Sequence, residues 1–81
     1  MSDIVKTHFI IRMRIVQRGD EIQTRPGAEG YHKGEPIIKR YTVEGLTKGG
    51  EIAVRDKEGG LHVFARKSVE EAWDIIENPP D

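Results

Sequence analysis

Apolar and polar residues alternate with a period of two along much of the chain, which is typical of strands with one buried face. From His8 to Arg18 this alternation predicts a single strand. Gly19-Asp20 then has the composition of a two-residue turn, so residues 21–25 are expected to return as the antiparallel partner of that strand. The apolar face of the first strand would carry Phe9, Ile11, Met13 and Ile15.

A long loop is expected next, because residues 26–36 hold three glycines and two prolines. So many breakers do not fit a regular element, and a loop of this kind is typically flexible and often carries function. Alternation resumes over residues 37–44 and predicts another strand. Gly45 and Gly49-Gly50 are expected to bracket the turn that follows it.

The clearest hairpin joins two short β-rich runs, residues 51–56 and 61–65, through Lys57-Glu58-Gly59-Gly60. The two glycines allow the positive φ angles that tight hairpin turns need. These two runs are therefore expected to pair with each other.

One helix is expected, over residues 69–77. Ser68 and Glu71 have the spacing of a capping box, in which each side chain accepts a hydrogen bond from an amide at the helix start. Asn78-Pro79-Pro80 would end the helix, because proline cannot continue it. An apolar stripe at helical spacing would pack on the sheet, with the tryptophan as its main anchor, and consists of Val69, Ala72, Trp73 and Ile76.

These elements predict one domain over residues 1–81, of the α+β class and mainly antiparallel. The expected architecture is a small curled sheet or half-open barrel of four or five strands, with one C-terminal helix packed on it. Hydrophobic residues make up 36% of the chain and charged residues 33%. Both values depart from the usual ~45–50% and ~25%, so the core must be thin. A homodimer would relieve that shortage, and the sequence leaves the oligomeric state and the strand order open.

Composition also bears on the compartment and on the partners. The chain has no cysteine, which favours a reducing, cytoplasmic setting. Its longest apolar run is Phe9-Ile10-Ile11, far below the ~18 residues that span a bilayer, so no membrane association is expected. The formal net charge is −1, whereas general nucleic-acid binders usually carry an overall basic balance. A protein partner is therefore favoured over nucleic acid.

No catalytic residue, cofactor or metal ligand is predicted. The histidines His8, His32 and His62 have no paired spacing that indicates converging ligands. The serines are Ser2 and Ser68, and neither they nor a cysteine supply a credible nucleophile beside a base. We therefore expect a protein that is not an enzyme.

The first group of candidate binding residues is a basic strand face. Arg12, Arg14 and Arg18 fall at alternate or near-alternate positions, and Arg40 could align with them on a neighbouring strand. Arginines on one sheet surface can grip phosphates or the carboxylates of a protein partner. The alternative is that they are outward charges that prevent edge-to-edge pairing.

The second group of candidates is Tyr31, His32 and Lys33, in the expected 26–36 loop. Tyrosine is enriched at interface hot spots, so an aromatic on a loop tip is a candidate contact residue. The alternative is that the Tyr31 ring folds back over the open edge of the sheet.

Taken together, these features favour a small non-enzymatic protein-binding module, an inhibitor or regulator of a larger macromolecular machine. Small size without catalytic residues is typical of phage or accessory-gene products, although that is an association and not a derivation. The alternative is a nucleic-acid-binding small β-barrel that uses the same arginines together with Tyr41.

Overall fold

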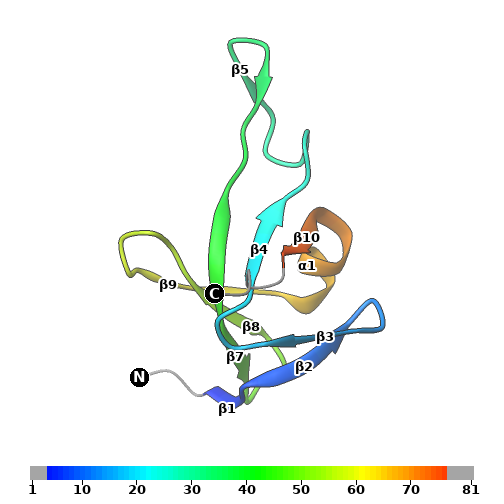
Figure 1. The fold of residues 1–81 in the computed structure, drawn as a ribbon, viewed down its shortest axis with the longest axis vertical. Helices are drawn as coiled ribbons and strands as arrows, with labels where there is room; N and C mark the ends of the chain where they lie inside the picture. Colours follow the sequence, from blue (N-terminus) through cyan, green and yellow to red (C-terminus); the bar gives the residue numbers. More distant parts are fainter. Residues whose placement is uncertain (1–3, 77–81) are drawn as a thin grey trace.

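The structure, a computed structural model, describes residues 4–76, and its centre is a curled antiparallel sheet (Figure 1). Five strands follow one another across it in the order β10 (Trp73–Ile76), β4 (Glu21–Thr24), β7 (Arg40–Thr47), β8 (Ile52–Arg55) and β9 (Leu61–Phe64). A sixth strand, β1 (Ile4–Lys6), pairs with β7 off this path. The sheet is not closed, but it curls until the ring centroids of Phe64 and Trp73, on its two end strands, lie 5.4 Å apart.

The core fills the inside of this curl, and the strands contribute alternate residues to it as half-buried strands do. Each of β4, β7 and β8 has a fully buried β-branched side chain on its inner face, namely Ile22, Val43, Ile52 and Val54, because such residues pack well on a pleated surface. The buried cluster comprises Phe9, Ile11, Val16, Ile22, Val43, Ile52, Val54, Val69 and Trp73.

Gly45 lies inside β7 and not in a turn, so the prediction that it brackets a turn is wrong. Its φ angle is +150° at a register shift in the β7–β8 ladder. A Cβ there would overlap the carbonyl oxygen of Lys6 and the side chain of Ile4, so glycine permits β1 to cross this close to β7. The turn itself is formed at Gly49-Gly50, as predicted.

The predicted strand from His8 to Arg18 is two strands, β2 (His8–Ile11) and β3 (Arg14–Gln17), which pair with each other as a separate two-stranded sheet. The chain reverses at Arg12-Met13, where no glycine, asparagine or proline marks a turn. Because β3 is paired with β2, residues 21–25 do not pair with the His8–Arg18 segment as predicted. As β4, they lie instead between β7 and β10.

Residues 26–36 form an arm with its own short hairpin, β5 (Tyr31–His32) and β6 (Glu35–Pro36), rather than an irregular loop. Figure 1 shows this arm projecting from the top of the sheet. Residues 37–39 belong to its base, so the next strand begins at Arg40 rather than at residue 37. The Lys39 carbonyl accepts a hydrogen bond from the Thr24 amide at 2.9 Å, which attaches the base of the arm to β4.

The helix α1 spans Arg66–Ala72, earlier and shorter than the predicted 69–77, and β10 follows it directly. Its N-cap is Ala65, which makes no side-chain capping bond, so the predicted capping box of Ser68 and Glu71 is wrong. Ladder pairing with β4 outcompetes helix propensity from Trp73 onward. Glu77 and the predicted stop at residues 78–80 lie outside the described residues.

The predicted fold class is confirmed: a small α+β unit, mainly antiparallel, whose curled, unclosed sheet carries one short helix near the C-terminus. The helix packs on the sheet through the fully buried Val69. The predicted hairpin of residues 51–65 is present as β8 and β9. No helix within residues 4–76 is long and apolar enough to cross a membrane.

Candidate functional site

The β2–β3 hairpin has two apolar faces, of which only one is buried. Cross-strand partners share a face, so the pair Phe9 and Val16 points into the core with Ile11. The opposite pair, Ile10 and Ile15, points to solvent with exposed fractions of 54% and 70%. The outer surface of this hairpin therefore presents branched aliphatic side chains to solvent.

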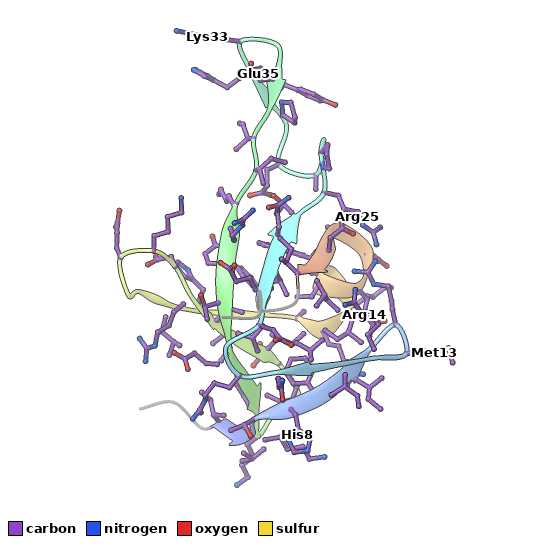
Figure 2. All side chains as sticks on the ribbon, in the orientation of Figure 1. His8, Met13, Arg14, Arg25, Lys33 and Glu35 are labelled. Atoms are coloured by element: carbon purple, nitrogen blue, oxygen red, sulfur yellow. The ribbon has the colours of Figure 1, made fainter. Side chains whose placement is uncertain are left out.

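Met13 extends this apolar surface at the tip of the hairpin and is 96% exposed (Figure 2). Arg12 and Met13 have φ angles of 49° and 64°, the left-handed backbone of a type I′ turn. Side-chain-bearing residues adopt it at a free-energy cost of roughly 1–2 kcal/mol each, and strain of this kind is found preferentially at functional positions. We call Ile10, Met13 and Ile15 the hairpin face.

A groove of about 650 Å³ adjoins the hairpin face, between β1 and β2. Its apolar wall includes Val5, Ile10 and Leu46. Its polar wall includes Lys6, which is cationic, and Arg66, whose guanidinium is paired with Glu70 at 3.0 Å. The groove therefore favours an apolar group that carries or adjoins a negative charge.

Of the predicted basic face, Arg12 and Arg14 lie together beside β10. The Arg12 guanidinium donates to the carbonyl of Trp73, and Arg14 donates to that of Ile75 at 3.5 Å. Both carbonyls point away from β4, so the two arginines cover the outer edge of β10. This position accords with the edge-protecting alternative considered for these arginines.

The other two arginines of the predicted face lie elsewhere. Arg18 donates to the carbonyl of Glu44 at 2.9 Å, and Arg40 donates to the side-chain oxygen of Gln23 at 2.7 Å. The structure therefore does not gather Arg12, Arg14, Arg18 and Arg40 on one surface, because the chain turns at residues 12–13 and does not continue as one strand.

The predicted group Tyr31, His32 and Lys33 lies at the tip of the arm, with all three side chains exposed. Lys33 has a φ angle of 52° and Gly34 one of 82°, so this hairpin also turns through a type I′ geometry. The Tyr31 hydroxyl lies beside Gly27 within the arm rather than over the sheet edge. Figure 2 shows Lys33 at the tip of the arm at the top and Met13 at the tip of the β2–β3 hairpin at the lower right, well apart from each other.

A second cluster of side chains lies at the mouth of the curled sheet and was not predicted. Tyr41 of β7 and Phe64 of β9 meet Trp73 of β10, with Tyr41 5.4 Å from Phe64 and 5.3 Å from Trp73 between ring centroids. Rings this close pack on one another and leave no space between them for a cation or a base. Two hollows flank Tyr41, of about 540 Å³ and 360 Å³, and both include Lys39 in their walls.

One hydrogen-bonded pair and one ion pair border these hollows. His62 is hydrogen-bonded to Asp56 (Nε2 to Oδ2, 2.8 Å), and together with the Gly60 amide this lowers the pKa of Asp56 below its ordinary value. Lys39 bonds to Glu29 at 3.0 Å, which raises the pKa of the lysine. Both contacts stabilise the charged forms, so these groups hold the arm base and the β8–β9 turn in place.

The described residues contain no group of three histidine, aspartate or glutamate side chains placed to hold a metal ion. Comparisons of the chain with protein-family models, with curated proteins and with solved structures find no match. Functional inference therefore depends on the surfaces themselves.

The residues of the hairpin face were missed as a site, because Met13 and Ile15 were predicted to face the core with Phe9. A signal was present in the sequence: Ile10 and Val16 lie on the predicted polar face, so a single strand leaves apolar residues on both sides. The turn at residues 12–13 moves Val16 to the core face and leaves Ile15 on the solvent face with Ile10.

Proposed function

We propose that the protein is a non-enzymatic protein-binding module whose contact surface is the hairpin face, and that its partner presents an apolar group bordered by carboxylates. In this proposal the protein acts in the cytoplasm as an inhibitor or regulator of a larger assembly. The observation that carries it is the exposure of Met13, Ile15 and Ile10 on one hairpin with a strained tip.

Exposed aliphatic residues that cluster on one surface are unusual on a chain whose hydrophobic content is only 36%. With so few apolar residues, the sequence nevertheless places three of them outward on one hairpin. Methionine is enriched in interfaces, and its flexible side chain adapts to the shape of a partner. Burial of these side chains in a partner would supply the apolar centre that a stable protein interface needs.

The charge around the hairpin face supports an acidic partner. The Arg12 guanidinium is held by a neutral carbonyl, and a neutral acceptor leaves the positive charge uncancelled. Lys6 adds a cationic group to the adjoining groove, whereas the Arg66 guanidinium there is paired with Glu70 at 3.0 Å. Such a rim steers an acidic surface into place and selects against basic partners.

The placement of the arginines favours this proposal over the nucleic-acid alternative. A phosphate-binding surface needs several cations that follow one backbone path, whereas Arg18 and Arg40 lie apart from Arg12. Tyr41, the base-stacking candidate, is packed against other rings. Nucleic-acid binding is therefore an outcome of the test rather than a second proposal.

The test compares two matched variants in capture from a lysate of the source cells. Ile15→Asp places a negative charge in the hairpin face, and Tyr31→Asp places one at the arm tip, and both residues are exposed, so neither variant should unfold. We expect Ile15→Asp to lose a nuclease-resistant protein partner that the wild type and Tyr31→Asp retain. Loss with Tyr31→Asp alone, or capture of nucleic acid that weakens steeply with salt, would contradict the proposal.

A further inference from the structure

The two edge strands of the curled sheet, β10 and β9, differ in whether other parts of the chain bond to their outer main-chain groups. At the β10 end, Arg12 and Arg14 donate to the outward carbonyls of Trp73 and Ile75. At the β9 end, strand pairing within the described residues is with β8 alone. Natural sheets normally blunt an end strand with lysine, proline, a bulge or a covering segment. β9 has none of the first three: it reads Leu-His-Val-Phe in a regular register.

The main-chain groups at this edge can be assigned from the ladder. The amide of Asp56 donates to the carbonyl of Gly60 at 3.0 Å, and bonded pairs alternate along an antiparallel ladder. His62 and Phe64 therefore bond to β8, and the amides and carbonyls of Leu61 and Val63 point to the free edge. Donors and acceptors two residues apart match the main chain of an added strand and no other common ligand.

Both surfaces beside this edge are suited to alternate side chains of such a strand. On the outer surface, Leu61 and Val63 are 41% and 46% exposed and would contact one set of residues. On the inner surface lie the two hollows that flank Tyr41. One has walls that include the β8–β9 turn at Asp56, and the other has walls that include Phe64 and Ser68 at the opposite end of β9. Side chains two residues apart are about 6–7 Å apart along a strand, so both hollows are within reach of one short segment.

We propose that β9 is a strand-addition site for an extended peptide segment of a partner protein, with an apolar or aromatic side chain in the hollow against Phe64 and Trp73. This site is separate from the hairpin face and does not depend on it. A second copy of the chain, pairing β9 with β9, is the competing occupant and is an outcome of the test.

The probe is a phage-displayed library of linear peptides selected on the full-length protein, and the selected peptides are then titrated by fluorescence anisotropy. Val63→Pro removes an amide hydrogen that points outward, so it should block strand addition and keep the β8–β9 ladder. Val63→Thr keeps both the amide hydrogen and the branched shape and is the matched control. We expect Val63→Pro to weaken binding at least about tenfold and Val63→Thr to change it little.

Amide hydrogen exchange on the wild-type complex keeps the proposal testable if Val63→Pro does not fold. The Leu61 and Val63 amides should gain protection on peptide binding, whereas the His62 and Phe64 amides are already bonded within the sheet. No selected peptide, equal affinity for Val63→Pro, or unchanged Leu61 and Val63 exchange would overturn the proposal, as would a dimer that Val63→Pro abolishes. Ile15→Asp should bind the peptides normally, so failure here is distinguishable from failure of the proposed function.

Discussion

The β2–β3 hairpin and the β5–β6 arm share a turn geometry but differ in almost everything else. Each reverses through two residues with positive φ, Arg12-Met13 in one and Lys33-Gly34 in the other. The first hairpin packs one face into the core, and the second is exposed on all four of its strand residues. Core packing holds the first hairpin in its turn although neither turn residue favours a positive φ angle. The arm, which lacks such packing, has glycine at the second turn position.

The largest effect is expected when the core anchor of the first hairpin is removed. Ile11→Ala deletes a fully buried side chain and should lower the free energy of unfolding by about 2–4 kcal/mol. Ile38→Ala, at the half-exposed base of the arm, should change it by less than about 0.5 kcal/mol. Urea unfolding followed by tryptophan fluorescence measures both. Similar losses in the two variants would show that the hairpins do not differ in their attachment to the core.

Met13→Gly should raise stability and lower function at once. Glycine relieves the left-handed strain but adds freedom to the unfolded chain, so we expect a net gain of about 0.5–1 kcal/mol. Because Met13 is almost fully exposed, no packing is lost with its side chain. Partner capture should weaken in the same variant. A stabilised variant that still captures the partner fully would separate the turn strain from function.

The reciprocal change, Gly34→Met, tests the arm. It places a side chain where φ is +82°, so the free energy of local opening of the arm turn should fall by roughly 1 kcal/mol. The free energy of global unfolding should change by less than about 0.5 kcal/mol, because β5 and β6 bury no side chain. Amide exchange of residues 31–36 compared with that of β7 resolves the two effects. A large global loss would show that the arm is coupled to the core.

The smallest effect concerns the β8–β9 turn, which the Asp56 side chain stabilises through hydrogen bonds. Hydrogen bonds from His62 and from the Gly60 amide lower the pKa of Asp56, so its contribution is present above the ordinary aspartate pKa of about 4 and is lost as pH falls through the lower folded value. Asp56→Asn should therefore be less stable than the wild type near pH 5. The difference in urea midpoint should shrink toward pH 2, and a pH-independent difference would contradict this assignment.

The parts of the fold that the sequence predicted correctly are those where local signals and tertiary packing agree. Glycines at positions 59 and 60 marked the β8–β9 turn, and alternation marked β8 and β9. The errors arose where local signals and tertiary packing conflict. Arg12-Met13 turns without a turn residue, and Trp73–Ile76 leaves a helical pattern because β4 offers it a ladder. Such choices depend on partners distant in sequence, which no local pattern reports.

The candidate sites followed the same division. Tyr31, His32 and Lys33 were predicted to lie on a loop, with the Tyr31 ring either exposed or folded over the sheet edge, and the structure places all three exposed at the arm tip. The common surface expected for the four arginines depended on one uninterrupted strand, and it was lost with that strand. The outward orientation of Met13 and Ile15 depends on the same turn and could not be assigned without it.

The most direct test of the account replaces Met13 with the photoreactive p-benzoylphenylalanine and crosslinks the protein in lysate, with the same replacement of Tyr31 as the control. The account predicts a light-dependent protein adduct from position 13 that excess wild-type protein competes away, and no such adduct from position 31. Adducts from position 31 alone, or a nuclease-sensitive adduct from position 13, would contradict the assignment of the hairpin face as the partner-binding surface.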